Sequence, residues 1–326
     1  MNTINKNIKT FPQYDKIKIN KLTYYELEPE ENIFSDVVAD ITHRCNMTCK
    51  NCYIPNRNVP DMDIDRMIDC ISKLPNRTMI RIIGAEPTMR NDLHKIIERI
   101  RATGNRCTLL TNGLKLASNK YVVSLKKARL SHVYISLNGV DNNDWYEEID
   151  ELRCAKVKIM ALKNIYANKF ILDTGTIIVK GVNDEAPLRM LNLLKRENIV
   201  HAVCRFKNVG QLGRYMKESG DENYTQEQMI TLISKQVGVS EDYIWEWKNK
   251  PIYQNDHVED CSFMFPLESN AANKFLHRSG IWIKIADWDV GNKPTAFPGQ
   301  TRRGRITEDF KIAPFFEHVK LNEGGY

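Results

Sequence analysis

The chain of 326 residues is long enough to bury a large core, and its length permits one large α/β domain or two smaller ones. It has 47 Lys and Arg against 41 Asp and Glu, and the formal net charge of +6 gives only a mild bias toward anionic partners. The sequence contains no run of about 20 apolar residues and no apolar signal segment, so we expect a cytoplasmic protein that works without a membrane.

Residues 1–33 are interpreted as an N-terminal basic extension. Their first 22 positions carry five lysines against a single acidic residue, Asp15. A second basic group, Arg302, Arg303 and Arg305, lies near the other end of the chain. Such charge runs usually keep a surface solvated, and an anionic substrate is the alternative.

From residue 34 to 210, short apolar runs alternate with segments of helical periodicity, which is typical of βα units around a parallel sheet. The six predicted strands are 36–41, 79–84, 106–111, 132–137, 174–180 and 201–206. Helices are predicted at 64–74, 93–100, 116–128, within 143–168, and at 185–197, the last with Asn183 or Asp184 as its cap. The pattern predicts an α/β fold, either a partial (βα)6 TIM-type barrel or an open doubly wound sheet, with chemistry at the carboxyl ends of the strands.

The alternation stops after residue 210. Thr225 and Gln228 form a T-x-x-Q capping box that predicts a helix over 226–236, and a second helix is expected around 240–248. Residues 251–326 show only irregular or short-strand patterns. We therefore predict three parts: the basic extension 1–33, a core at 34–210, and a small, substrate-determining C-terminal extension of mixed α and irregular structure at 211–326.

Three of the eight cysteines lie in "THRCNMTCKNCY", residues 42–53, with the spacing C-x3-C-x2-C. In a reducing compartment, such a cluster is typical of a metal or catalytic site rather than a disulfide. Zinc usually takes four ligands from two separated pairs, and although His43 could be a fourth ligand, the sequence has no second C-x-x-C. An iron-sulfur cluster on Cys45, Cys49 and Cys52, with one iron left open, accounts better for three ligands, and zinc remains the minor alternative.

The same loop resembles that of the radical S-adenosylmethionine (SAM) superfamily, where it follows the first strand of a partial barrel. Similar motifs end the later strands: "GAEP" (84–87) resembles the Gly-Gly-Glu-Pro motif that approaches the methionine amine, "TNG" (111–113) ends the third strand, and "SLNG" (136–139) resembles a Ser-Leu-Asp-Gly stretch. "VKGVND" (179–184) is similar to a subgroup with molybdenum-cofactor and peptide-modifying members, and no auxiliary-cluster domain is evident. The resemblance covers about residues 34–210.

This resemblance implies two cofactors, a [4Fe-4S] cluster on the three cysteines and SAM. With one electron from a donor such as a flavodoxin or ferredoxin, SAM is cleaved to a 5'-deoxyadenosyl radical that abstracts hydrogen from a peptide, nucleic acid or small molecule, with alkylation and methylation among the candidate outcomes. The residues expected to bind the cofactor are Tyr53, Gly84, Glu86, Pro87, Asn112, Ser136, Asn138 and Arg205. The sequence departs from the family pattern at Asn51, where an aromatic residue is usual and Tyr53 could substitute, and at Ala85, which replaces a glycine.

Several of these residues also have a purely structural interpretation. Glu86 could be a surface carboxylate, and Ser136 and Asn138 could serve only a turn. Arg205 and Arg214 could clamp a carboxylate or phosphate, or form surface ion pairs.

The remaining cysteines give weaker signals. Cys70, Cys107 and Cys204 are expected to be buried thiols. Cys261 could ligate a metal with His257 and Asp260, but no other cysteine lies nearby and no second cluster is predicted. The competing function for the whole chain is a non-catalytic iron-sulfur or zinc module that senses redox state or binds nucleic acid through its basic ends.

Overall fold

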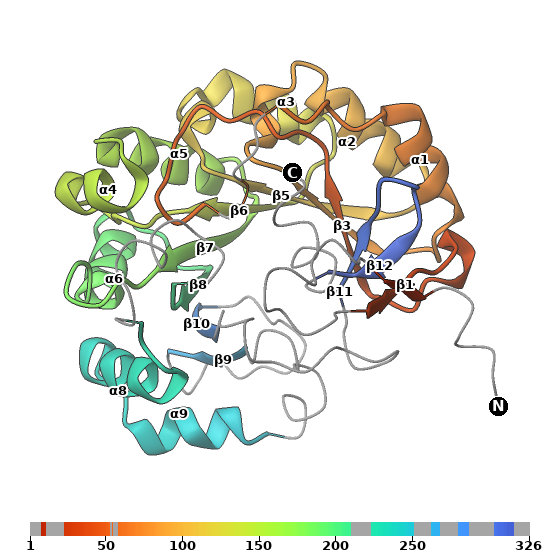
Figure 1. Ribbon diagram of the computed structural model, residues 1–326. Helices are drawn as coiled ribbons and strands as arrows, with labels where there is room; N and C mark the ends of the chain where they lie inside the picture. The colour runs from red at the N-terminus through yellow and green to blue at the C-terminus, as the bar shows by residue number, and fades with distance from the viewer. Residues whose placement is uncertain are drawn as a thin grey trace. The chain divides into compact units, whose positions relative to one another are not determined.

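The structure is a computed structural model that describes residues 8–10, 23–52, 54, 58–209, 223–250, 262–267, 280–286 and 303–315. The chain separates into two compact units, which are described one at a time. Unit 1 comprises Met1–Asn46, Ile54–Leu109 and Asn292–Tyr326, and unit 2 comprises Met47–Tyr53 and Leu110–Gly291. Figure 1 labels the elements of both.

Unit 1 is built on parallel strands that follow one another along the chain. The neighbours β3 (Asp36–Asp40), β4 (Met79–Ile83) and β5 (Arg106–Thr111) confirm the first three predicted strands. From the carboxyl-terminal part of the chain, β11 (Arg303–Ile306) pairs in parallel with β3, and β12 (Ile312–Pro314) pairs antiparallel with β11. A separate ladder joins β1 (Ile8–Thr10) to β2 (Thr23–Tyr25). The strand order in the larger sheet of this unit is β12-β11-β3-β4-β5.

Helices cover one face of this sheet. The helix α1 (Ile64–Lys73) begins where Asp63 accepts a hydrogen bond from the backbone N–H of Arg66, and α2 (Leu93–Ala102) follows β4. Their apolar stripes are buried, as are alternate strand residues such as Val37 and Ile80. Figure 1 shows both helices on the same side of β3 and β4. Short 3-10 turns, η3 (Pro29–Glu31) and η4 (Pro87–Met89), complete the described part of unit 1.

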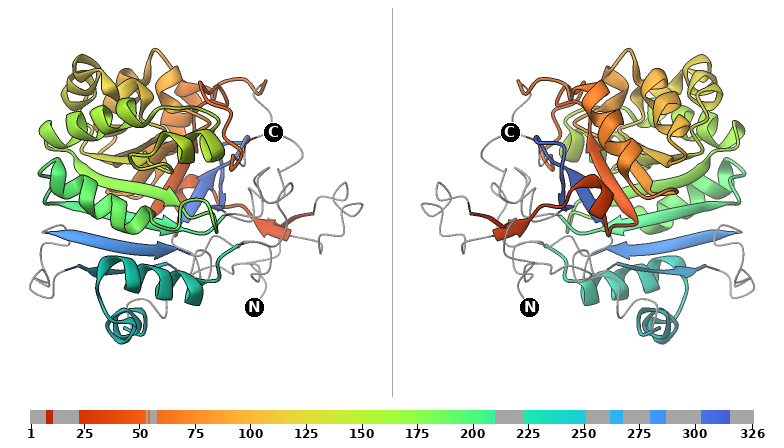
Figure 2. Two further views of the ribbon diagram at one scale, coloured as in Figure 1. Left: turned by 90° about the vertical axis from the view of Figure 1, so that its left-hand side faces the viewer. Right: turned by 90° about the vertical axis from the view of Figure 1, so that its right-hand side faces the viewer.

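Unit 2 repeats the βα pattern. Its strands β6 (His132–Ser136), β7 (Ile171–Ile177), β8 (Ala202–Lys207) and β10 (Ile281–Ala286) are parallel neighbours, and β9 (Phe263–Pro266) pairs antiparallel with β10. The order is β6-β7-β8-β10-β9. Figure 2 shows β10, in blue, running beside the green strands of this unit. The predicted strands in this half are confirmed, with β7 beginning three residues earlier than expected.

The helices of unit 2 refine the predictions. They are η5 (Leu114–Ala117), α3 (Asn119–Lys127), α4 (Asn143–Asp150), α5 (Ala155–Ala167), α6 (Ala186–Arg196), α8 (Gln226–Val237) and α9 (Glu241–Lys248). The stretch 143–168 holds two helices because the chain takes a left-handed conformation at Glu151, with φ of 53°. The capping box of Thr225 and Gln228 is confirmed at the start of α8.

The predicted cap of the helix at 185–197 is wrong. Glu185 occupies the capping position of α6 and makes no side-chain capping bond. The amide of Asn183 is used elsewhere, because it accepts from the Val179 N–H and donates to the carbonyl of Ile177. The carboxylate of Asp184 accepts from the N–H of Gly181. Both side chains therefore shape the preceding loop instead of the helix end.

The C-terminal extension contains more regular structure than expected. Its helices α8 and α9 fit the prediction, while β9, β10, β11 and β12 are additional strands of the larger sheet. The domain boundaries at residues 33 and 210 remain predictions. No helix in the described ranges has both the length and the apolar character required to cross a membrane.

Candidate active site

The backbone that leads into Cys45 is held by the "GAEP" segment in unit 1. The N–H of Ile41 donates to the carbonyl of Ile83 at 3.0 Å, that of Ala85 to Thr42 at 2.9 Å, and that of Glu86 to Arg44 at 3.0 Å. The ladder of β3 and β4 thus continues beyond both strands. The residues immediately before the first cysteine are consequently fixed in position.

The backbone conformation at position 84 requires a glycine. Its φ is +153°, and a Cβ built on it would collide with the carbonyl oxygen of Thr42. Ala85, by contrast, is not among the residues with positive φ, so its methyl group imposes no comparable strain. The substitution of the family's second glycine by Ala85 is therefore compatible with the close approach, which occurs at Gly84.

A network of hydrogen bonds and ion pairs also holds residues 41–44 in position. Thr42 Oγ1 donates to Asp61 at 2.5 Å, and the Arg44 guanidinium donates to the same carboxylate at 2.6 Å. The buried Arg90 donates to the carbonyl of Ile41 at 2.9 Å. Burial opposes ionisation of Asp61, but hydrogen bonds from Arg44 and Thr42 and the charge of Arg90 outweigh it and lower the pKa of the carboxyl. The network stabilises the approach to Cys45 as long as Asp61 is ionised.

Glu86 is fully buried, so its interpretation as a surface carboxylate is wrong. One of its oxygens accepts hydrogen bonds from the N–H of Thr88 at 3.0 Å and from the Thr88 hydroxyl at 2.6 Å. Pro87, which is also buried, opens the 3-10 turn η4. The two motif residues are thus locked in one conformation at the carboxyl end of β4.

The second and third cysteines belong to unit 2. The N–H of Cys52 donates to the carbonyl of Cys49 at 3.2 Å, and the N–H of Lys50 donates to the carbonyl of Ile149 at the end of α4 at 3.0 Å. Lys50 also pairs with Glu148 at 3.0 Å. This part of the cysteine loop is therefore attached to α4 by both backbone and side chain.

A buried polar group lies next to Cys49. Burial raises the pKa of its thiol strongly, the carboxylate of Asp150 raises it further, and the ammonium of Lys158 opposes both. Asp150 and Lys158 are almost completely buried, and Lys158 donates to the carbonyl of Ser136 at 3.0 Å. Sequence reasoning missed this acid and lysine. The available signal was a lysine on the otherwise apolar stripe of α5.

Asn138 has a structural role, as the alternative to cofactor binding expects. Its Nδ2 donates to Asp150 at 2.8 Å, and its Oδ1 accepts from the N–H of Ile177 at 3.1 Å. Both polar groups of this buried amide are thus used to join β6, α4 and β7. A contact between Asn138 and a cofactor remains a prediction.

The other predicted residues have varied surroundings. Ser136 is partly exposed at the carboxyl end of β6, and Asn112 accepts from the N–H of Leu114 at 3.0 Å at the start of η5. Asn51 is partly exposed. Several candidates lie outside the described residues: Tyr53, Arg214, His257, Asp260 and Cys261.

Arg205 lies in β8 and does not form the ion pair that its alternative interpretation expects. Its guanidinium stacks over the ring of Tyr134, with the central carbon 5.1 Å from the ring centroid. Its Nε is buried without a hydrogen-bond partner. Within the described ranges, no carboxylate pairs with it. The side chain is therefore oriented by an aromatic ring while its charge is left uncompensated.

The remaining thiols behave as expected. Cys70, Cys107 and Cys204 are buried and free, and burial raises the pKa of each to about 12. Such thiols stay protonated and inert at neutral pH. They are distinct from Cys45, Cys49 and Cys52, which are only half-buried.

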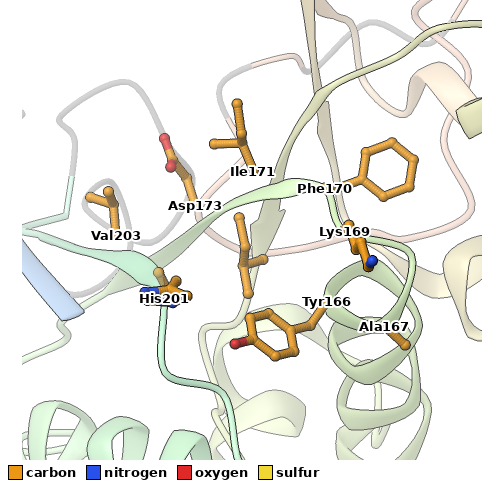
Figure 3. Close-up of a pocket in the computed structure, with 10 residues that line it drawn as sticks. Tyr166, Ala167, Lys169, Phe170, Ile171, Asp173, His201 and Val203 are labelled. Atoms are coloured by element: carbon orange, nitrogen blue, oxygen red, sulfur yellow. The ribbon is translucent and has the colours of Figure 1, made fainter. Parts of the chain in front are cut away.

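A cavity of about 530 Å³ lies elsewhere in unit 2, at the amino ends of β7 and β8. Figure 3 shows Tyr166, Phe170 and His201 among its lining residues. In βα folds the amino ends of the strands contribute to stability and the carboxyl ends carry the chemistry. We assign this cavity no catalytic role.

The donor chemistry of the cysteine loop fits an iron-sulfur cluster. Among the described residues, no three Cys, His, Asp or Glu side chains are already gathered at metal-binding distance. The loop nevertheless offers three half-buried cysteines within eight residues that form no disulfide, and thiolates are the usual ligands of such clusters. Hydrogen bonds from "GAEP" hold the residues before Cys45, and α4 holds Lys50 between Cys49 and Cys52.

Comparison with known proteins agrees with this arrangement. Residues 40–194 match the family model of the Radical SAM superfamily. Over 157 residues the chain is 31% identical to the 7,8-dihydro-6-hydroxymethylpterin dimethyltransferase of Methanocaldococcus jannaschii, covering 44% of this chain and 30% of that protein. Over 218 residues it is 25% identical to the GTP 3',8-cyclase of Staphylococcus epidermidis, covering 63% of each. The chain thus spans less than two thirds of these relatives.

Solved structures share the fold. SuiB of Streptococcus suis bound to its precursor peptide SuiA gives a TM-score of 0.53 at 17% identity, covering 72% of this chain and 49% of SuiB. SuiB bound to S-adenosylmethionine gives 0.51 at 16% identity, covering 72% and 50%. These matches confirm the predicted fold class, an α/β enzyme fold of the partial TIM-barrel type.

Residues 40–194 thus match the radical SAM superfamily, whose members are enzymes that use a [4Fe-4S] cluster and SAM. This match supports the resemblance inferred from the sequence motifs. Because members of this family are enzymes, an enzymatic function is favoured over the competing non-catalytic redox or nucleic-acid-binding module.

Proposed function

We propose that the chain binds a [4Fe-4S] cluster through Cys45, Cys49 and Cys52, and SAM beside it, and that it modifies a substrate by hydrogen abstraction. When bound and reduced by one electron, these cofactors supply a 5'-deoxyadenosyl radical. The observation that supports this most directly is the anchored loop at the carboxyl end of β3, with three cysteines that form no disulfide. The electron donor is proposed to be a flavodoxin or a ferredoxin.

The protein's own contribution is binding and orientation. Glu86 is proposed as an acceptor for the methionine ammonium, because a carboxylate can accept several hydrogen bonds and the bonds from Thr88 hold its side chain in one conformation. Gly84 and Pro87 fix the backbone on either side of it. Ser136, Asn112 and Tyr53 are proposed to contact the rest of SAM, while Asn138 positions the end of β6.

A peptide, a nucleic acid and a small molecule are all compatible with hydrogen abstraction. A cytoplasmic location is part of the proposal, because a reducing compartment keeps the three loop cysteines available as thiols.

The proposal is tested by reconstituting the full chain with iron and sulfide without oxygen, then reducing it in the presence of SAM. About four irons per chain and release of 5'-deoxyadenosine are expected. Cys45→Ala should lower both, whereas Cys107→Ala, which removes a buried thiol outside the loop, should leave both intact. A fully loaded, reduced protein that releases no 5'-deoxyadenosine would contradict the proposal, and tetrahedral zinc in place of iron would contradict the cluster assignment.

A further inference from the structure

Two oppositely charged side chains are buried beside Cys49 in unit 2. Asp150 is the last residue of α4, and Lys158 lies in the first turn of α5. Asp150 is only 1% exposed and Lys158 is 0% exposed. Aspartate and lysine are almost never buried so completely unless they are paired, because removing a charge from water is costly. Each of these two residues therefore requires a compensating group nearby.

Asp150 is held next to Cys49 by the backbone. The N–H of Lys50 donates to the carbonyl of Ile149 at 3.0 Å, which brings together the residues beside this donor and this acceptor, Cys49 and Asp150. Their two side chains are joined by a hydrogen bond. Asp150 also accepts a hydrogen bond from Nδ2 of Asn138 at 2.8 Å. The carboxylate thus has a fixed position between the cysteine loop and the residues that follow β6.

Lys158 approaches the same cysteine from α5. Its Nζ donates to the carbonyl of Ser136 at 3.0 Å and lies 5.5 Å from the ring centroid of Tyr146. Its ammonium acts on Cys49 in the direction opposite to that of Asp150. An ammonium can donate several hydrogen bonds, of which Ser136 accepts one. Over the described ranges, no carboxylate forms an ion pair with Lys158, so the anion that compensates it is not one of the described carboxylates.

The surroundings of Lys158 are buried as well. Tyr146 is 0% exposed, and its hydroxyl donates to the carbonyl of Val140 at 3.3 Å. A Cβ built on Gly139 would collide with the Tyr146 ring, so the glycine of "SLNG" leaves the space that this ring fills. Charges interact more strongly in a buried environment than in water. Lys158 and Asp150 can therefore act on a group bound at Cys49 without being its ligands.

We propose that Asp150 and Lys158 set the reduction potential of the cluster that Cys49 helps to hold, an inference that rests on the proposed radical SAM function. The potential of an iron-sulfur cluster depends on nearby charge, on hydrogen bonds to its sulfurs and on solvent exposure. Residues beyond the ligands tune metal centres in this way. Reduction adds a negative charge to the cluster, which an ammonium favours and a carboxylate opposes. Lys158 therefore raises the potential, and Asp150 lowers it.

The test is a redox titration of the reconstituted full chain without SAM, followed by electron paramagnetic resonance of the reduced cluster. Lys158→Met should lower the potential and Asp150→Asn should raise it, each by about 59 mV or more, a tenfold change in the equilibrium constant for one electron. The double variant should return toward the potential of the unchanged chain, because the two effects oppose each other. Lys156→Met and Asp144→Asn, at exposed positions of α5 and α4, are the matched controls and should leave the potential unchanged.

Equal potentials in the single variants and the unchanged chain would overturn the inference, and so would shifts of the same sign in both variants, because a distorted loop has no reason to follow the sign of the removed charge. Either single variant tests the sign by itself, and circular dichroism with iron and sulfide analysis identifies the folded, loaded proteins. If both variants folded but took up no cluster, the two residues would serve cluster assembly and the inference would be wrong. An unchanged chain that takes up no cluster contradicts the proposed function itself, whereas equal potentials in loaded proteins contradict only the role of Asp150 and Lys158.

Discussion

The two units use charged strand residues in opposite ways. In unit 1, the face of β3 and β4 that carries Asp36 and Asp40 has its charges arranged in pairs, Asp36 with Arg81 at 4.0 Å and Asp40 with the buried Arg305. In unit 2, the guanidinium of Arg205 in β8 lies instead over the ring of Tyr134, 5.1 Å from the ring centroid. The strand charges of unit 1 are therefore held by opposite charges, whereas the arginine of β8 is oriented by an aromatic ring.

The largest expected effect comes from breaking the buried pair of unit 1. Arg305→Met leaves the carboxylate of Asp40 buried without its partner, which should lower the free energy of unfolding by about 3–5 kcal/mol. The double variant Asp40→Leu with Arg305→Met should recover most of that loss, because neither charge remains. Chemical denaturation measures both. If the single variant lost less than about 1 kcal/mol, the pair would not have the structural role assigned to it.

Gly84→Ala should have the next largest effect. The new methyl group would meet the carbonyl of Thr42 and force a strained φ, so both the stability and the iron content of the reconstituted protein should fall. Gly238→Ala is the control, since Gly238 also has a positive φ but has open space around it and should cost only about 1 kcal/mol. Equal losses in the two variants would mean that the contact between Gly84 and Thr42 is unimportant.

Most of the strands could be predicted from the sequence, because apolar runs mark β3 to β8. The start of β7 was missed because Asp173 interrupts its apolar pattern, and this residue lies 3.0 Å from His132 on the neighbouring strand. The strand β11 was also missed, because Arg303 and Arg305 make its sequence polar. In the structure it pairs with β3, more than 260 residues earlier in the chain. Its strand character depends on a partner that local periodicity does not reveal.

The sequence points to candidate site residues where a motif marks them, and it gives no signal where only the fold brings residues together. The cysteine loop and "GAEP" were identified from spacing and strand-end position. Asp150 and Lys158 were not, because a charged residue in a helix is normally exposed, and its burial beside Cys49 depends on how α4 and α5 pack. The exposure of Glu86 was wrong for a related reason, since Thr88 supplies the hydrogen bonds that make its burial possible.

Gly175→Ala sharpens the comparison from the side of unit 2. The added Cβ would collide with Tyr134 and displace its ring from the guanidinium of Arg205, so the free energy of unfolding should fall by about 1–3 kcal/mol. Adding Tyr134→Phe to the same chain removes the hydroxyl that collides and should recover part of the loss. Chemical denaturation measures both variants, and an unchanged stability of Gly175→Ala would show that Tyr134 does not need the space beside Gly175.

The smallest effect is expected from pH, through Asp61 in unit 1. The folded protein lowers the pKa of Asp61 below its usual value, so ionised Asp61 stabilises the fold above the unfolded pKa of about 3.9, and this contribution is lost as pH falls through the lower folded pKa. Asp61→Asn should therefore flatten the acid side of the stability curve, whereas Asp242→Asn, at an exposed position in the first turn of α9, should not. Thermal unfolding between pH 7 and the acid limit measures the slopes. An equally steep acid slope in Asp61→Asn would mean that Thr42 and Arg44 hold the approach to Cys45 without the carboxylate charge.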